Sequence, residues 1–378
     1  MESLPRSCAV HVGTSDGFPG LLTGFIMIIF REFALPLQSY LLACALATLF
    51  SAHVFAESSV VPASSAVPVM LEKIEISGEQ PGPGMWRVSK GDHILWIVGT
   101  QTPVPQKMTW RAKGIEAIIA QSQQVLTAPS VSVSLKQIGY FRALTMLPSA
   151  MQARKNPDGA LLKDIVPAEL YARWSVMRDK YIEQYNPDDE ENDIERMRPM
   201  YAAMELYRKA ISKVGLTSAS PVWPVIRDAA NKHKVKITEV KLEPAINDPR
   251  GALKELRASR LADLDCFAKT IERIETDLAA MRVRANAWAT GDINAIRSLP
   301  AADQRAACEA AIRDASFMKT LGAQNVPAQI ENAWLNAAEA ALKTDKVALA
   351  VLPIAQIVAP DGYVAKLRAK GYSVQEPE

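Results

Sequence analysis

The sequence predicts a helix-rich α/β (α+β) fold, in which a mixed sheet uses strands near both ends of the mature chain and a long helical region lies between them. Three observations support this fold class. Apolar strand patterns occupy residues 85–100 and 346–354, amphipathic helical patterns fill most of the chain between them, and no internal repeat of solenoid length is evident. The 378 residues are 49% hydrophobic, which is enough apolar material for a sizeable core.

The N-terminal region has the pattern of a secretory signal peptide. An apolar run at residues 40–50 is too short for a comfortable membrane span, and Val54 and Ala56 follow it at the positions that a signal peptidase accepts. We expect residues 1–56 to be removed after Ala56, leaving a periplasmic or secreted protein without a stable membrane span. Met27 is a more natural start than Met1, because the residues before it have no signal-like pattern. An uncleaved membrane anchor is the alternative.

Residues 57–83 are rich in Ser, Pro and Gly and predict a flexible tether, so that 84–378 form a single domain. Within this domain, residues 85–100 predict a hairpin around the turn Lys90-Gly91-Asp92. A helical pattern at 110–124 follows, and then extended structure at 125–133. This order of strand, helix and strand predicts a parallel pair joined by a right-handed crossover.

The central part of the chain is expected to be mainly helical. The acidic stretch at 188–193 lacks the ligand spacing of a calcium loop, and acidic residues at the entry to a helix explain it better. An amphipathic helix is then predicted to lead into a strand at 235–239. A very long helix follows, and its apolar residues are spaced alternately by three and four: Leu264, Phe267, Ile271, Ile274, Leu278, Met281, Ala285 and Trp288. A core helix is favoured over a coiled coil or an external interaction surface.

The C-terminal part predicts two helices over about 301–342 and a strand at 346–354. A helix at 361–370 then ends at Gly371, and a last strand covers 372–376. Cys266 and Cys308 are the two cysteines that remain after signal removal. In an oxidising compartment they predict one disulfide, with two buried thiols as the alternative.

Composition and motifs argue against several functions. The net charge is only +2 and the basic residues are scattered, which is unlike a nucleic-acid-binding protein. Neither a G-x-S-x-G nucleophile elbow nor a phosphate-binding glycine loop occurs. His93 and His233 are the histidines of the mature chain, and neither has a further ligand at suitable spacing. The sequence therefore predicts no metal and no cofactor.

The two ends of the mature chain, considered together, resemble a known family. A strand ends at Gly99-Thr100, a C-terminal strand is followed by the segment DGYVAKLRAKGYSV, and a long helix between them closes on Trp288 and a Gly-Asp pair. This arrangement resembles the TraB/GumN family, which is related to the Tiki proteins, over roughly residues 84–376.

The resemblance implies where a site would lie. Family members thought to be metal-dependent hydrolases carry two G-x-x-H motifs and acidic residues on nearby strands. The first motif falls on 99–102 and places Thr102 at the histidine position, and the second falls on 353–356 and places Gln356 there. The acidic positions fall on Thr127 or Ala128, and near the segment 239–241, which begins with Glu239.

This chain therefore resembles a divergent member that lacks the G-x-x-H histidines. A hydroxyl and a carboxamide are poor ligands for a transition metal and are not general bases near neutral pH. We expect a pseudoenzyme that binds a small-molecule or protein ligand through a pocket. The motif-equivalent pocket positions are Gly99, Thr100, Thr102, Gln356 and Glu239. The alternative is a hydrolase or peptidase-like enzyme whose site is rebuilt from Glu239, His93 or other carboxylates.

Overall fold

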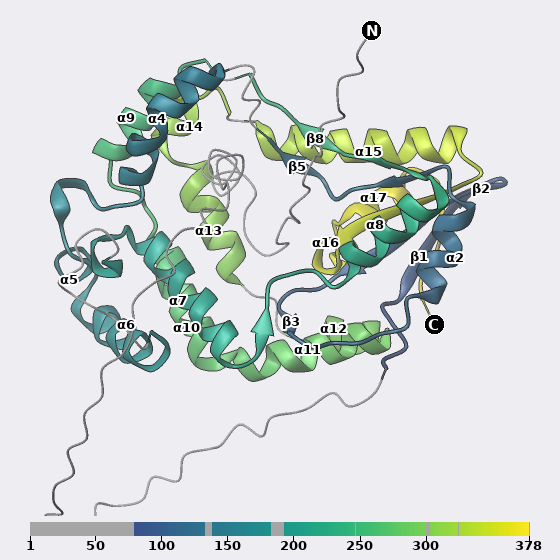
Figure 1. Ribbon diagram of the computed structural model, residues 1–378, viewed down its shortest axis with the longest axis horizontal. Helices are drawn as coiled ribbons and strands as arrows, with labels where there is room; N and C mark the ends of the chain where they lie inside the picture. The colour runs from purple at the N-terminus through teal and green to yellow at the C-terminus, as the bar shows by residue number, and fades with distance from the viewer. Residues whose placement is uncertain are drawn as a thin grey trace, which may run out of the picture.

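The computed structural model describes residues 79–132, 138–182, 193–245, 247–299, 303–323 and 325–377. It consists of a sheet with helices on both faces and a helical region beside the sheet (Figure 1). The predicted signal peptide, its cleavage after Ala56, the start at Met27 and most of the tether lie outside the described residues. So does the acidic stretch at 188–193, except for Asp193, whose side chain accepts a hydrogen bond from the backbone N–H of Glu195.

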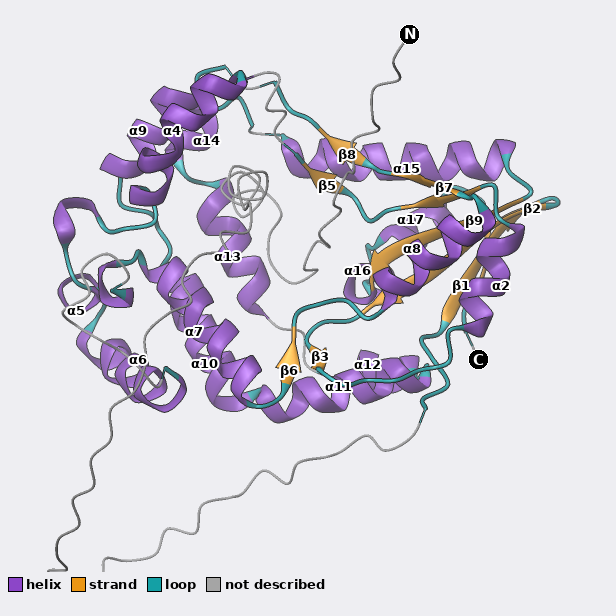
Figure 2. Ribbon diagram, in the orientation of Figure 1, coloured by secondary structure: helices purple, strands orange, loops and turns teal. Residues whose placement is uncertain are grey.

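The large sheet confirms the predicted fold class. Its strands are β1 (Met85–Lys90), β2 (His93–Thr100), β4 (Gln124–Leu126), β7 (Lys236–Thr238), β9 (Val347–Pro353) and β10 (Ser373–Gln375). Their order across the sheet is β10-β1-β2-β9-β4-β7, shown in orange in Figure 2. β1 is antiparallel to β2 and β10, and β2, β9, β4 and β7 are parallel. The hairpin predicted around Gly91 is present, and Gly91 has the positive φ of 60° that such a turn favours.

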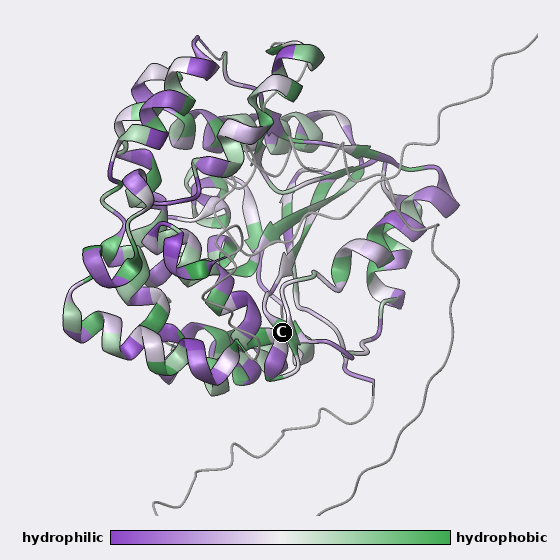
Figure 3. Cartoon of the chain, turned by 60° about the vertical axis from the view of Figure 1, so that its left-hand side comes forward, coloured by the Kyte–Doolittle hydropathy of each residue, from purple (hydrophilic) through white to green (hydrophobic). Residues whose placement is uncertain are grey.

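Strand β9 corrects one prediction about this sheet. β2 and the strand after the first helix, β4, are parallel but are not neighbours, because β9 lies between them. All five residues from Ala348 to Leu352 are buried. Such a continuous apolar run is stable only where helices cover both faces of the strand, which is the centre of the sheet. The hydrophobic colouring of the central strands in Figure 3 reflects this burial.

Helices cover both faces of the sheet. α2 (Lys113–Gln121) and α8 (Val222–His233) pack together on one face. α15 (Val326–Thr344) and α17 (Tyr363–Ala369) lie on the other face, as right-handed crossovers into β9 and β10 require. The rings of Trp334 and Tyr363 are 4.7 Å apart, and Lys366 pairs with Glu331 at 2.6 Å, so α15 and α17 are joined directly.

The helical region forms two further hydrophobic clusters beside the sheet. Its helices are α4 (Tyr140–Gln152), α5 (Leu162–Ile165), α6 (Ala168–Tyr181), α7 (Pro199–Lys213), α9 (Pro249–Ala258), α10 (Leu264–Thr276), α13 (Asp303–Arg313) and α14 (Ser316–Thr320). The remaining elements are β3 (Val104–Pro105), β5 (Ser130–Val131), β6 (Leu216–Thr217), β8 (Lys241–Leu242), α11 (Leu278–Thr290), α12 (Ile293–Ser298), α16 (Ile354–Val358), η1 (Pro157–Gly159) and η2 (Ile194–Arg196). The region predicted to hold two helices after residue 300 therefore contains α13, α14 and α15.

Buried Arg198 fixes the ends of three helices in this region. It lies at the start of α7 and is 1% exposed. Its Nε donates to the carbonyl of Ala153 after α4, and its Nη1 donates to the carbonyl of Ser259 after α9, each at 2.8 Å. A guanidinium is favourable at helix C-termini, where carbonyl dipoles are unsatisfied. The C-terminal ends of α4 and α9 are consequently held against α7.

The predicted long helix is two helices, α10 and α11, that meet at Asp277. Asp277 has φ −109° and ψ −1°, and its carboxylate lies 3.6 Å from both Arg273 and Arg284. Phe267 to Met281 belong to the helical region, whereas Ala285 and Trp288 belong to the core of the sheet. The seam changes core between Met281 and Ala285, within α11.

The burial of the apolar seam also decides between the predicted roles of this segment. Phe267, Ile274 and Met281 are each at most 1% exposed within the single chain. The seam is therefore part of the core, and its use as an external coiled coil is excluded.

The segment at 79–83, predicted as the end of the tether, also packs on the fold, because Gly82 N–H donates to the carbonyl of Ala289 at 2.8 Å.

The predicted disulfide is present between Cys266 of α10 and Cys308 of α13, whose Cα atoms are 4.5 Å apart. Both cysteines are completely buried. The bond closes a loop with a sequence separation of 42 residues. It joins two helices of the helical region without reaching the sheet.

Replacing both cysteines, Cys266→Ser with Cys308→Ser, is expected to lower the free energy of unfolding by about 4 kcal/mol, because the unfolded chain regains the entropy of an open loop. Urea denaturation of the oxidised wild type and of the double variant measures this. Reduced wild-type protein is the control and should match the double variant. A loss below about 1 kcal/mol would contradict the role assigned to the bond.

Candidate functional site

The carboxyl ends of the four parallel strands meet at one edge of the sheet. At this edge the chain leaves β2 towards α2 on one face, and leaves β9 towards α17 on the opposite face. Neighbouring parallel strands whose connections diverge in this way form a topological switch point, the usual position of a ligand site in an α/β fold. We refer to this place as the β2–β9 edge.

Both motif-equivalent segments lie at the β2–β9 edge. Gly99 and Thr100 are the last residues of β2 and pair with Leu352 and Pro353 of β9, across a strand spacing of about 4.8 Å. Thr102 follows two residues after β2. Gln356 lies in α16, which begins directly after β9. The structure thus places Thr100 of the first segment beside Pro353 at the start of the second, although they are separated by about 250 residues in the sequence.

Gly99 is closely packed at this edge. A Cβ atom at Gly99 would lie 3.0 Å from Cγ1 of Ile354, because α16 crosses closely over the end of β2. The carbonyl of Gly99 accepts a hydrogen bond of 2.7 Å from Nε1 of buried Trp288. Thr100 is 4% exposed, and its hydroxyl donates to the carbonyl of Leu352 at 3.4 Å. Gly99 and Thr100 therefore position the backbone of the β2–β9 edge through packing and hydrogen bonds.

Gln356 has an unusual environment. Its Oε1 atom is buried and accepts no hydrogen bond from the described residues. Its backbone carbonyl is approached so closely that a Cβ atom on Gly362 would lie 2.2 Å from it, which explains the glycine before α17. Gln101 provides a contrast at the same edge, since its Nε2 donates to the carbonyl of Thr102 at 3.0 Å. The Gln101 carboxamide is thus used by the fold, and the partly buried Gln356 leaves its buried Oε1 acceptor unsatisfied.

Thr127 is one of the two residues, with Ala128, at which the family resemblance predicts an acidic position. Its hydroxyl donates to the carbonyl of Ala128 at 3.1 Å and accepts from the N–H of Val240 at 3.0 Å. Its carbonyl accepts a hydrogen bond of 3.2 Å from Nε1 of Trp334. The hydroxyl is therefore committed to joining the chain after β4 to the chain after β7.

The role of Trp288 and Trp334 as donors was missed by the sequence analysis, which could identify them only as apolar residues of helices.

Glu239 follows β7 at the same edge but points to solvent. Its side chain is 54% exposed and lies 3.7 Å from Nζ of Lys241, which is also 3.1 Å from Glu243. The hydrogen bond to Glu243 and the charges of both carboxylates raise the pKa of Lys241. Nearby Tyr363 remains a neutral phenol, since burial raises its pKa to about 12. Neither Glu239, which points to solvent, nor Tyr363, which stays neutral, is placed to act as a general base at this edge.

Both histidines lie at the opposite edge of the parallel strands. His93 begins β2, and its Nδ1 is 2.7 Å from the carbonyl of Asp345. The length of β2 puts His93 about 23 Å from Thr100. His233 is exposed at the end of α8, before β7 begins. Within the part of the chain that the structure describes, no three His, Cys, Asp or Glu side chains gather as metal ligands.

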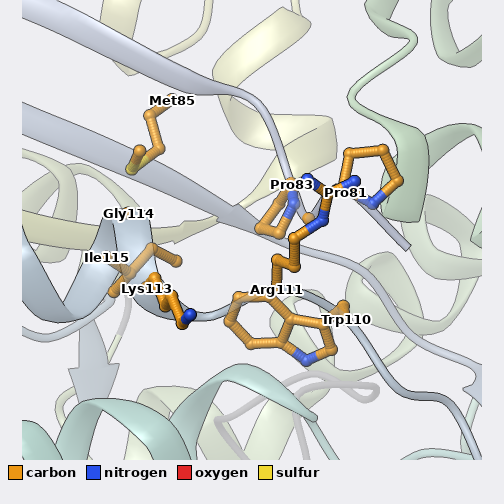
Figure 4. A pocket seen from close by; sticks show the side chains of 9 residues that line it. Pro81, Pro83, Met85, Trp110, Arg111, Lys113, Gly114 and Ile115 are labelled. Carbon is orange, nitrogen blue, oxygen red and sulfur yellow. The ribbon is translucent and has the colours of Figure 1, made fainter. Parts of the chain in front are cut away.

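A cavity of about 360 Å³ lies beside the β2–β9 edge, where the segment 81–85 passes over the start of α2. Figure 4 shows Met85, Lys113 and Ile115 on one side and Pro81, Pro83 and Trp110 on the other. The Trp110 and Trp288 rings meet edge to face at 6.2 Å. The cavity contains none of the motif-equivalent residues, so it is not the site that the sequence analysis predicted.

The comparisons with known proteins bear on this geometry. A family model described as the TraB/PrgY/gumN family matches residues 84–376, which include both segments of the β2–β9 edge and all strands of the described sheet. Searches of the curated proteins and of the solved structures each gave no significant match. The resemblance inferred from the sequence is confirmed: the chain belongs to the TraB/PrgY/gumN family.

Proposed function

We propose that this protein binds a small-molecule or protein ligand at the β2–β9 edge and does not carry out the metal-dependent hydrolysis attributed to members of its family. The observation that carries the proposal is the pair Thr102 and Gln356. The two segments retain their places at the ends of the central strands, but the residues at the histidine positions are a hydroxyl and a carboxamide.

The available side chains do not fit a catalytic metal. Neutral hydroxyl and carboxamide groups are weak ligands for transition metals, and they do not accept a proton near neutral pH. The histidines do not replace them, since a zinc–nitrogen bond is about 2.1 Å long and His93 is about 23 Å from the edge. Thr127, at an acidic position, has its hydroxyl already engaged by backbone groups.

The unsatisfied acceptor on Gln356 favours binding. A buried carbonyl oxygen without a hydrogen bond costs about 1–3 kcal/mol. A ligand that donates an N–H or O–H group to Gln356 Oε1 would recover this energy. The ligand is therefore expected to carry a hydrogen-bond donor.

The rival function is an enzyme with a rebuilt, non-histidine site. It needs an acid and a base that converge on Thr102 and Gln356. Glu239 is exposed and paired with Lys241, and His93 lies at the other edge of the sheet. No contact in the described structure favours a rebuilt catalytic site. Hydrolysis assays distinguish such an enzyme from a binding protein.

We further propose that the protein acts in the periplasm or outside the cell. The signal-peptide pattern before Ala56 supports this, and so does the Cys266–Cys308 disulfide, a bond typical of oxidising compartments. Among the described helices, none has the length and apolar character needed to cross a membrane.

Metal content and hydrolysis test the proposal together. The protein purified without chelators is expected to contain far less than one transition-metal ion per chain by mass spectrometry, because the β2–β9 edge lacks strong ligands. Peptide hydrolysis is expected to stay at the rate of the buffer. One tightly bound metal per chain, with hydrolysis that a chelator abolishes, would contradict the proposal.

A His93→Ala, His233→Ala variant is the matched control, because it removes surface imidazoles without changing the β2–β9 edge. Metal that disappears in this variant is adventitious and supports the proposal. Metal-independent hydrolysis that is lost on Gln356→Ala but kept in the histidine variant would establish the rival enzyme instead.

A further inference from the structure

Helix α4 exposes an apolar ridge on its outer side. The ridge residues are spaced by three, four and three, so they share one helix face: Phe141, Leu144, Pro148 and Met151. Phe141 is 83% exposed, and Leu144 and Met151 are 44% and 45% exposed. The opposite face of α4 packs into the helical region through Ala143, Met146 and Ala150. This arrangement leaves a well-packed helix with a second apolar face that no described residue covers.

A row of basic side chains lies on α9, next to α4. Arg250, Lys254 and Arg257 are exposed and are spaced by four and three, which places them on one face of the helix. None of them forms an ion pair with a described acidic residue. Arg250 Nη2 donates to the hydroxyl of Thr145 on α4 at 3.1 Å, so this row turns towards the ridge.

A groove of about 240 Å³ separates the two helices. Its walls are Thr145, Met146 and Ser149 from α4, and Arg250, Leu253, Lys254 and Arg257 from α9. The helices lie side by side at the end of the helical region remote from the sheet (Figure 1). We call the ridge and the groove together the α4–α9 surface. It presents exposed apolar side chains beside cations and hydroxyl groups.

We propose that the α4–α9 surface docks on an anionic lipid bilayer. α4 is about 20 Å long and lies flat on the fold, so Phe141, Leu144 and Met151 can enter the boundary between headgroups and acyl chains together. Lipid phosphates then occupy the groove, where Arg250, Lys254, Arg257 and the Ser149 hydroxyl line the walls. Juxtamembrane cations each strengthen binding to an anionic leaflet.

The charge of the α4–α9 surface argues against a second copy of this chain as the occupant. A two-fold symmetric contact would bring the same ridge together from both copies and place their Arg250, Lys254 and Arg257 close to one another. Like charges across an interface oppose association. An anionic surface complements both the ridge and the cations.

Vesicle co-sedimentation tests the proposal. Wild-type full-length protein is compared on phosphatidylcholine vesicles and on equimolar phosphatidylcholine–phosphatidylglycerol vesicles. The triple variant Arg250→Gln, Lys254→Gln, Arg257→Gln is expected to lower the partition coefficient on anionic vesicles about 100-fold. Phe141→Ser with Leu144→Ser is expected to lower it at least about 10-fold. The N-terminal apolar run is common to all variants, so the differences report on α4 and α9.

Matched controls remove the same number of positive charges, or of exposed apolar side chains, elsewhere. Lys209→Gln, Lys232→Gln, Lys236→Gln removes three exposed charges from α7, α8 and β7, and Val176→Ser, Val283→Ser removes two exposed apolar groups. Both controls should bind anionic vesicles as the wild type does. Equal losses in the controls would overturn the proposal. So would equal binding of the wild type to both vesicle types, or a dimer that dissociates in the Phe141→Ser, Leu144→Ser variant.

Discussion

The insertion of β9 between β2 and β4 is the constraint on which the rest of this structure depends. The run Ala348–Leu352 is apolar on both sides, and only a central strand buries both sides. Once β9 is central, its end pairs with Thr100, and α16 passes over Gly99 so closely that a side chain there would meet Ile354. The β2–β9 edge is therefore a consequence of strand order: segments from both ends of the domain meet because one apolar strand must be covered.

The helical region is connected to this edge through one continuous apolar seam. The seam begins in the helical clusters on α10 and ends at Trp288 of α11, whose indole N–H holds the Gly99 carbonyl. Arg198 and the Cys266–Cys308 disulfide fix the helices at the far side. The molecule thus combines a sheet that carries the proposed ligand site with a helical region whose α4–α9 surface is not covered by any described residue. In this account the α4–α9 surface attaches the protein to a lipid bilayer, and the β2–β9 edge binds the ligand.

Local patterns in the sequence were sufficient for much of the fold. The hairpin around Gly91, the helix and strand after Val222, the C-terminal elements and the disulfide follow from periodicity, turn residues and a cysteine pair. The apolar run of β9 is typical of a central strand, but its insertion between β2 and β4 was not predictable, because strand order is set by contacts distant in sequence. Nor was the break at Asp277, since the apolar spacing continues through it. The positions of Thr102 and Gln356 came from the family resemblance, whereas the engaged hydroxyl of Thr127 and the unsatisfied acceptor of Gln356 exist only in the folded protein. The signal peptide and its cleavage stay predictions.

Whether Gln356 serves binding or folding is tested most directly by the free energies of unfolding of two matched variants. Gln356→Met replaces the unsatisfied carboxamide by an apolar group of similar size, and Gln101→Met does the same to a carboxamide that donates to Thr102. Urea denaturation should show Gln101→Met less stable by about 1 kcal/mol, and Gln356→Met unchanged or more stable by about 1 kcal/mol. An equal loss of unfolding free energy in both variants would contradict the proposal that Gln356 serves to bind a ligand.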